Sequence, residues 1–388
     1  MTTFDYLVTC PEEVKEVLRA ELHSYGATQL KDGFRSVYFT ATDEVAYRIH
    51  LSCGTGSQIM RVVRRCAGAS EKMVTSQAKR VKWHQVFAPQ RSYRIDGVCG
   101  DRGPQAMTSN QISKAVRLGL EDAFEYHGHP VPQVDLKDPD VVIFAYIYKA
   151  KLMLSVQTTG KGLHKRGYRS MSQHPAPVKE TLANAMLRLA GYDGSQTLWD
   201  PMCGSGTLAI EAAYLALGKA AMIHRKKGEF ALEKLCFFDK DLWRATQEQL
   251  RLQKAENLSA PIVAGDICPD YVADARQNAV AARVEKYLDF RTESIFDAVP
   301  PEQAGILMSN LPYGERVDFE GGESWQDFYM RLGHFLKHKC AGWQVFLLVD
   351  DRSPWKSIGL KPTRKWNLKN GALPVKLVHI DVYSGRRT

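Results

Sequence analysis

The sequence lacks the features that place a protein in a membrane or in an oxidising compartment. Its 388 residues contain no run of about 18 apolar residues, the length that a membrane-spanning helix needs. The amino-terminal stretch MTTFDYLVTCPEEV has neither the basic segment nor the long apolar segment of a secretory leader. The eight cysteines are scattered without one CxxC pair, so neither a zinc site nor a disulfide framework is indicated. These absences predict a cytoplasmic protein that holds no metal.

Acidic residues are scarce in two windows of the chain. Residues 51–100 hold nine Lys or Arg against two Asp or Glu, and residues 151–170 hold five against none. The resulting surpluses of +7 and +5 together exceed the net charge of +9 carried by the whole chain. Positive charge concentrated in this way favours a polyanionic partner.

The first 158 residues read as one or two small α+β modules. FDYLVTC, PEEVKEVLRAELHSYG and VYFTAT predict strand, helix and strand, because Pro11 starts the helix and Gly26 follows its end. Further on, VVIFAYIYKA and KLMLSVQTT predict two strands joined by a turn near residues 149–151. Residues 159–178 combine glycines, prolines and basic residues, which predicts a basic linker between domains.

After this linker, helical and strand patterns alternate to the end of the chain. The segments KETLANAMLRLAG, TLWDPM, GTLAIEAAYLALG and PIVAGDI begin this alternation, and GILMSN and WQVFLLVD continue it. Alternation of this kind predicts an α/β fold with a parallel sheet covered on both faces. RKWNLKN and VKLVHIDVY have the spacing of a hairpin, so an antiparallel strand is expected to complete the sheet.

The stretch LWDPMCGSGTLAIEAA follows a predicted strand and opens a predicted helix. Gly204 and Gly206 have no Cβ, so the backbone can turn sharply and a ligand can approach the helix amino terminus. Asp200, at the strand end, offers a carboxylate to an ammonium or hydroxyl group. Because Ala209 stands where dinucleotide-binding folds tolerate alanine, these residues alone also fit a nicotinamide-dependent dehydrogenase.

Two carboxylates are candidates for holding a ribose at the end of the next strand. Asp266 in IVAGDI is followed by a clear helix, DYVADARQNAVAA, whereas Asp239 lies in a charged stretch that has the character of an insertion. We favour Asp266 and keep Asp239 as the alternative, because a ribose-binding carboxylate normally ends the second strand.

The stretch SNLPYGER ends another predicted strand with Asn310, Leu311, Pro312 and Tyr313. In a doubly wound sheet the tips of these strands are neighbours at the topological switch point, where ligands bind. A ligand held by the Asp200 loop could therefore face a planar group held by Asn310.

DPMCGSGTLAIEAA, SNLPYGER and the preceding GLHKRGYR together resemble a known family. They are similar to the THUMP-containing class I RNA methyltransferases that use S-adenosylmethionine, in particular the 23S rRNA guanine-N2 methyltransferases of the RlmL type, of which the chain corresponds to one methyltransferase half. The resemblance implies a ferredoxin-like segment at 1–50, a THUMP domain at 51–158, and a Rossmann-like domain with a mostly parallel seven-stranded sheet at 179–388.

The resemblance also implies roles for individual residues. The expected cofactor site consists of Asp200, Pro201, Cys203, Gly204, Gly206, Asp266, Ser294 and Asn310, and the expected catalytic motif of Asn310, Leu311, Pro312 and Tyr313. Two positions depart from the family pattern: Leu311 replaces the usual first proline of Asn-Pro-Pro-Tyr, and Ser294 stands where the family more often has Asp. Pro312 still biases residue 311 toward an extended backbone.

The motif suggests how an exocyclic amine is methylated. We expect the Asn310 side-chain oxygen and the Leu311 carbonyl to accept the two N–H bonds of the amine, and Tyr313 to stack on the base after it leaves its helix. Cationic side chains are expected to position RNA through its phosphates: Arg61, Arg64, Arg65, Lys79, Arg80, Lys82, Lys165, Arg166 and Arg169.

Three further readings remain at this stage. The same four-residue logic serves an adenine-N6 methyltransferase, and the RNA could be tRNA, although the resemblance favours rRNA. A non-catalytic RNA-binding assembly factor is the alternative from another functional class.

Overall fold

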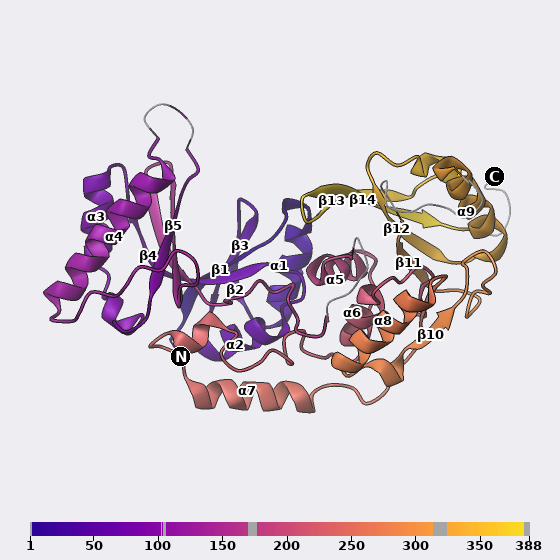
Figure 1. The fold of residues 1–388 in the computed structure, drawn as a ribbon, viewed down its shortest axis with the longest axis horizontal. Coiled ribbons are helices and arrows are strands. Elements are labelled where there is room, and N and C mark those ends of the chain that lie inside the picture. Colours follow the sequence, from indigo (N-terminus) through magenta and orange to yellow (C-terminus); the bar gives the residue numbers. More distant parts are fainter. Residues whose placement is uncertain (1, 102, 104–105, 170–176, 313–323, 384–388) are drawn as a thin grey trace.

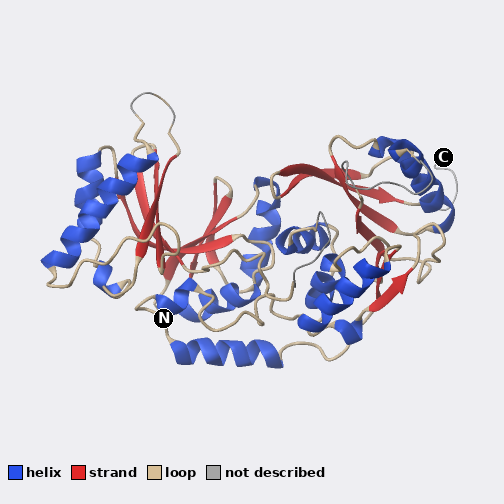
Figure 2. Ribbon diagram, viewed as in Figure 1, coloured by secondary structure: helices blue, strands red, loops and turns tan. Residues whose placement is uncertain are grey.

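The computed structural model describes residues 2–101, 103, 106–169, 177–312 and 324–383, arranged in two halves that each contain a seven-stranded sheet (Figure 1). Figure 2 shows the two sheets on opposite sides of the molecule, with helices between them and around them. No helix of the described residues is long and apolar enough to cross a membrane.

The first sheet has the strand order β2-β3-β1-β4-β7-β6-β5. Its strands are β1 (Phe4–Thr9), β2 (Thr28–Gly33), β3 (Ser36–Ala41), β4 (Gln58–Ala67), β5 (Tyr93–Cys99), β6 (Val141–Tyr148) and β7 (Lys151–Gln157). The predicted turn between β6 and β7 is confirmed, since Lys149 and Ala150 both have positive φ and Tyr148 pairs with Lys151.

Four helices accompany this sheet: α1 (Lys15–Ser24), α2 (Asp43–Ser52), α3 (Glu71–Lys79) and α4 (Ser109–Tyr126). The side chains of α1 and α2 pack in the same core as β1 and β3, and those of α3 and α4 pack with β6 and β7. Apolar spacing along each helix explains this packing, because residues three and four apart share one face.

The predicted boundary at residue 50 is not a boundary in the structure. It falls inside α2, and β4 pairs with β1 on one side and β7 on the other, so one continuous sheet runs through both predicted amino-terminal domains. The strands before and after residue 50 provide each other's backbone hydrogen-bond partners. A strand without a neighbour would leave these groups unpaired.

The second sheet has the strand order β10-β9-β8-β11-β12-β14-β13. Its strands are β8 (Leu198–Asp200), β9 (Ile262–Asp266), β10 (Asp289–Thr292), β11 (Ile306–Asn310), β12 (Gln344–Asp350), β13 (Arg364–Asn370) and β14 (Leu373–Asp381). Strands β8 to β12 run parallel to one another, and β14 is antiparallel to its neighbours β12 and β13. The prediction of a mostly parallel sheet finished by an antiparallel strand is confirmed.

Helices cover both faces of this second sheet: α5 (Glu180–Leu189), α6 (Thr207–Ala216) and α8 (Pro269–Ala281) on one, and α9 (Trp325–Lys339) on the other. Neighbouring strand residues point to opposite faces, as the pleat requires: Leu198 packs toward α5 and α6, whereas Trp199 packs toward α9. Parallel strands buried in this way need the near-continuous apolar runs seen in the sequence.

The segment between α6 and β9 contains α7 (Lys240–Leu252), which lies along the amino-terminal half beneath α2 (Figure 1). Asp239 caps α7 through its side chain, and its backbone N–H donates to the Tyr47 hydroxyl at 2.8 Å. The charged stretch that the sequence suggested to be an insertion thus includes α7. Through the amphipathic face of this helix it connects the two halves.

The predicted linker is packed rather than loose over its described residues. Leu163, Arg166, Tyr168 and Val178 are all buried. One apolar core runs from the strands of the first sheet through this segment to α5, α6 and the second sheet. The two halves are thus packed together through a shared core.

Candidate active site

The site forms where β8 and β11 end side by side. These strands are parallel neighbours, with Leu198 opposite Ile306 and Trp199 opposite Leu307. Their carboxyl ends bring Asp200 next to Ser309, whose hydroxyl donates a hydrogen bond to the Asp200 Oδ1 at 2.6 Å. A parallel register thereby joins two sequence motifs that are more than a hundred residues apart.

The loop after β8 is held by the end of β9. The Cys203 N–H donates to the Gly265 carbonyl at 2.8 Å, and the Gly204 N–H donates to Asp266 Oδ2 at 2.9 Å. The other oxygen, Asp266 Oδ1, accepts from the Cys268 N–H at 3.0 Å. Asp266 therefore holds the β8 loop with one oxygen and the start of α8 with the other.

Gly206 is required by both its backbone and its surroundings. It precedes α6 with φ of +75°, in the left-handed region that disfavours a side chain. A Cβ at this position would also lie 2.9 Å from the Ala275 Cβ on α8. The loop can therefore turn directly into the α6 amino terminus, where backbone N–H groups face outward.

A cleft lies between the two motifs. Its lining consists of Pro177, Val178, Asp200, Met202, Cys203, Gly204, Ser205, Thr207, Leu208 and Asn310. The β8 loop and the β11 tip thus face one cavity, together with the short stretch that precedes α5. Six lining residues were not among the predicted site residues: Pro177, Val178, Met202, Ser205, Thr207 and Leu208.

Asp200 lines this cavity as a buried acid with a raised pKa. Only 1% of its surface is exposed, and burial raises its pKa to about 7. Hydrogen bonds from Ser309 and from the Met202 backbone oppose this rise, while the nearby Asp266 adds to it. A carboxyl group in this state ionises readily when a cationic ligand group comes within reach.

Asn310 contributes a polar side chain to this cavity. Its side-chain Oδ1 is buried and has no hydrogen-bond partner among the residues that the structure describes. A buried acceptor without a donor costs about 1–3 kcal/mol, which a ligand donor can recover. The next residue, Leu311, is fully buried and its N–H donates to the Leu348 carbonyl at 3.0 Å, so the backbone at the β11 tip is fixed.

Other predicted site residues lie around this cavity. Pro201 is buried in the β8 loop, and Pro312 is half-buried after the β11 tip, whereas Tyr313 lies outside the described residues. Ser294 follows β10, and its hydroxyl accepts the Phe296 N–H at 3.3 Å. Ser294 does not belong to the cavity lining, so its predicted adenine contact stays a prediction.

Cys203 lines the cavity without offering a nucleophile. Its thiol is buried, and burial together with Asp200 and Asp266 keeps its pKa well above the ordinary value. A protonated thiol is a poor nucleophile, so packing is the role that fits.

The two candidates for the ribose carboxylate lie in different places, and the ribose contact itself stays a prediction. Asp266 ends β9 and contacts the β8 loop, whereas Asp239 is the amino-terminal cap of α7. Asp239 therefore serves the helix, and Asp266 is the carboxylate that stands at the sheet edge beside the cavity.

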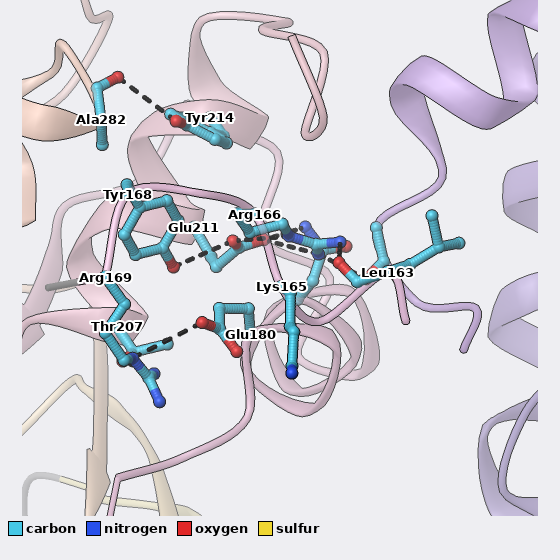
Figure 3. A network of polar contacts seen from close by, with 12 residues as sticks. Leu163, Lys165, Arg166, Tyr168, Arg169, Glu180, Thr207, Glu211, Tyr214 and Ala282 are labelled. Carbon is cyan, nitrogen blue, oxygen red and sulfur yellow. Dashed lines mark hydrogen bonds and ion pairs between the residues drawn. The ribbon is translucent and has the colours of Figure 1, made fainter. Parts of the chain in front are cut away.

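Two of the predicted phosphate contacts are wrong. Arg166 is 1% exposed, and its guanidinium forms two hydrogen bonds with the Glu211 carboxylate on α6 (Figure 3). Arg61 is 7% exposed and lies against the rings of Phe4 and Phe237. Buried cations need such partners, which leaves them unable to meet a phosphate.

The remaining predicted phosphate contacts differ in exposure. Those at the surface are Arg65, Lys79, Arg80, Lys82 and Lys165. Arg64 is half-buried and donates to Gln77, and Arg169 is half-buried and donates to Thr207 and the Val178 carbonyl. Within this exposed group, Lys79 pairs with Asp122 at 3.2 Å and Arg65 with Asp5 at 3.6 Å. Exposed pairs of this kind are weak, so these side chains can exchange them for contact with a polyanion.

Comparisons with known proteins agree with this geometry. The family model described as RMKL-like, methyltransferase domain, matches residues 166–379, and the THUMP domain model matches residues 68–157. A Synechocystis sp. protein provisionally named an RNA methyltransferase is 30% identical over 382 residues, covering 98% of each chain.

Two further matches differ in what they cover. The ribosomal RNA large subunit methyltransferase K/L of Shewanella frigidimarina is 31% identical over 376 residues, which are 95% of this chain but 52% of that protein. The chain thus spans about half the length of the K/L enzymes that it matches. The crystal structure of SMU.472, provisionally titled a methyltransferase and complexed with SAH, has a TM-score of 0.85 and 23% identity over all of both chains, which supports the fold.

These findings decide between the two cofactors that the glycine-rich loop allowed. The matched domain is a methyltransferase domain, so S-adenosylmethionine is confirmed as the expected cofactor and the nicotinamide-dependent alternative is not supported. With more than half of its residues matched by the methyltransferase model, the chain belongs to the RMKL-like family of S-adenosylmethionine-dependent RNA methyltransferases and carries a THUMP domain.

Proposed function

We propose that the protein methylates the exocyclic N2 amine of a guanosine in structured RNA, with 23S rRNA favoured over tRNA as the substrate. One observation carries this proposal: the buried Asn310 Oδ1, without a partner among the described residues, lies in the same cavity as Asp200. The rRNA assignment is supported by the names of the K/L relatives, which match most of this chain.

The cavity residues fit the proposed cofactor. Asp200 and the Gly204–Gly206 loop would surround its methionine part, and Asp266 would receive its ribose hydroxyls. Bound S-adenosylmethionine supplies a methyl group on a sulfonium, which is already activated for transfer.

The protein's own contribution is to orient the amine. A guanine amine is a weak nucleophile because its lone pair is delocalised into the ring. Asn310 Oδ1 and the Leu311 carbonyl would accept its two N–H bonds, which turns the lone pair out of the ring plane and toward the cofactor. Holding the reactants in this geometry lowers the barrier without a strong general base.

Asn310 and Leu311 would hold the amine while the cofactor supplies its methyl group, and the extra proton of the methylated amine would pass to water. Asn310 would lie next to the nitrogen while positive charge develops there, so its oxygen would stabilise that charge. Tyr313, outside the described residues, would stack on the extruded base. The exposed cations Arg65, Lys79, Arg80 and Lys82 would hold the RNA through its phosphates.

The test compares wild type with Asn310→Ala. We expect methyl transfer to fall by about 100-fold or more, the loss typical of a donor or acceptor that acts in the transition state. Binding of S-adenosylmethionine, measured by calorimetry, should stay within a few-fold of wild type. Asn367→Ala is the matched control, since Asn367 is exposed on β13 at the edge of the sheet.

Mass mapping of modified nucleosides identifies the product. RNA from a strain without the gene would be treated with the purified protein, and N2-methylguanosine in 23S rRNA is the expected result. N6-methyladenosine would instead favour the adenine reading, and a methylated tRNA would replace the rRNA assignment. Full methyl-transfer activity in Asn310→Ala would refute the proposed mechanism. If the wild-type protein does not bind S-adenosylmethionine, the alternative of a non-catalytic assembly factor is favoured.

A further inference from the structure

The segment 163–169 lies against α6, the helix that follows the glycine-rich loop (Figure 3). Arg166 bridges two parts of the protein, because it donates to the Glu211 carboxylate on α6 and, at 2.6 Å, to the Gly54 carbonyl after α2. The Tyr168 hydroxyl donates to the same Glu211 carboxylate at 3.2 Å. These buried contacts fix the backbone that leads into Arg169.

Arg169 contacts three residues from two segments. Its Nη2 donates to the Val178 carbonyl at 2.8 Å and to the Thr207 hydroxyl at 2.7 Å. Its Nε lies 3.5 Å from a carboxylate oxygen of Glu180 at the start of α5. The Arg169 side chain is 21% exposed and that of Glu180 is buried, so little water competes for these contacts.

Two of these partners are walls of the cofactor cavity. Val178 belongs to the stretch before α5, and Thr207 is the first residue of α6. Thr207 also has its hydroxyl 3.3 Å from that of Ser205, another lining residue. Arg169 thus links the wall before α5 to the loop and helix on the other side of the cleft.

The electrostatic field of α6 does not by itself favour the Arg169 cation beside its amino terminus. The amino terminus of a helix carries partial positive charge, so a neighbouring guanidinium is unfavourable there unless other groups compensate. The compensation comes from Glu180, and the hydrogen bonds come from the planar donor fork that arginine has and lysine lacks. The position therefore uses arginine for its geometry.

We propose that Arg169 is a positioning residue of the cofactor site, which joins Val178 to Thr207 and so sets the width of the cavity and the affinity for S-adenosylmethionine. This replaces the phosphate contact expected from the sequence. The inference rests on the proposed function only in that the cavity takes this cofactor, and it holds whichever base is methylated.

The neighbouring Lys165 makes the two roles separable. Lys165 is exposed, belongs to the same basic segment, and its side chain is absent from the cavity lining. A cation that contacts RNA lowers RNA affinity when it is removed and reduces the salt dependence of binding. A residue that positions the cavity changes cofactor affinity instead.

The experiment measures both affinities in Arg169→Ala, Arg169→Lys and Lys165→Ala. Calorimetry gives the Kd for S-adenosylmethionine, and a filter assay gives the Kd for 23S rRNA at two salt concentrations. Arg169→Ala should weaken cofactor binding about tenfold or more, since two hydrogen bonds from a charged donor are lost. Arg169→Lys should recover only part of this loss, and RNA affinity should stay within twofold of wild type.

Lys165→Ala should show the opposite pattern, with unchanged cofactor affinity. In steady-state assays, Arg169→Ala should raise the KM for S-adenosylmethionine and leave the KM for RNA unchanged. An unchanged cofactor Kd in Arg169→Ala, or a loss of RNA affinity and salt dependence like that of Lys165→Ala, overturns the proposal.

Substitutions of Thr207 keep the proposal testable if Arg169→Ala unfolds. Thr207→Ser keeps the hydroxyl and should bind the cofactor like wild type, whereas Thr207→Val should weaken binding. In a folded double variant, Thr207→Val should add little to the effect of Arg169→Ala, because both remove the same contact. Equal cofactor affinity in Thr207→Ser and Thr207→Val contradicts the proposal. A wild-type protein that binds no S-adenosylmethionine would instead contradict the proposed function.

Discussion

The buried Asp200 predicts that cofactor affinity depends on pH. Its pKa of about 7 leaves the carboxyl mostly protonated below neutral pH. S-adenosylmethionine bears a sulfonium and an ammonium group, and both favour an ionised Asp200. Binding should therefore weaken as the pH falls, because the carboxyl must first lose its proton.

The size of the effect follows from the fraction ionised. With a pKa of about 7, this fraction is about 0.9 at pH 8 and about 0.01 at pH 5, so the Kd should rise about 90-fold across this range. Calorimetry at several pH values measures this change, and buffers with different ionisation enthalpies should report one proton released on binding near pH 6. The Cys203 thiol does not contribute, since its raised pKa keeps it protonated throughout.

In the ligand-free protein, a rise in pH has the opposite effect, because it lowers the folding stability. A carboxyl whose pKa is raised on folding favours the folded state at low pH, and this stability is lost as the pH rises from about 4 to about 7. Thermal unfolding without cofactor should show a decline over this window, on the order of 4 kcal/mol at most for a shift of this size.

Two variants test the assignment to Asp200. Asp200→Asn cannot titrate, so the pH dependence of cofactor binding should disappear. Ser309→Ala removes a hydrogen bond that lowers the Asp200 pKa, so the midpoint should move to higher pH. A Kd that stays within twofold from pH 5 to pH 8 in wild type, or a pH profile that survives in Asp200→Asn, would refute the reasoning.

Two further predictions concern α6. Gly206→Ala should weaken cofactor binding and lower the free energy of unfolding by about 1–2 kcal/mol or more from the positive φ alone. The contact of the new Cβ with Ala275 should add to this loss. Gly218→Ala is the control in denaturant unfolding, because Gly218 has φ of +61° but open space for a Cβ, so only the backbone cost remains. Glu211→Gln should lower the free energy of unfolding by about 3–5 kcal/mol because it leaves the buried Arg166 uncompensated, whereas Glu285→Gln should cost about 1 kcal/mol or less, since its pair with Arg276 is exposed. A small loss for Glu211→Gln in the same unfolding assay, or equal losses for the two glycine variants, would count against these assignments.

Local pattern alone was sufficient for much of the second half of the chain. The runs that became β8, β9, β11 and β12 are short and apolar, and each ends in a residue that cannot continue a buried strand. The final hairpin was also predicted correctly, because alternation with period two is a property of neighbouring residues.

Three elements were absent from the predictions made from the sequence: α3, β5 and α7. The strand β5 is held by its parallel partner β6, so its own residues give only a weak signal. The helix α7 has apolar residues along one face, but they lie in the charged stretch that was interpreted as an insertion.

The basic residues show most clearly what a sequence can and cannot determine. The sequence by itself established how much positive charge the chain carries and where it is concentrated, because charge is a property of each residue. Only the tertiary structure decided that Arg166 is paired inside the protein, that Arg169 bonds to the cavity wall, and that Lys165 between the domains remains at the surface. The physical reason is that burial and pairing depend on Glu211 and Thr207, which are brought close to these residues only when the chain folds.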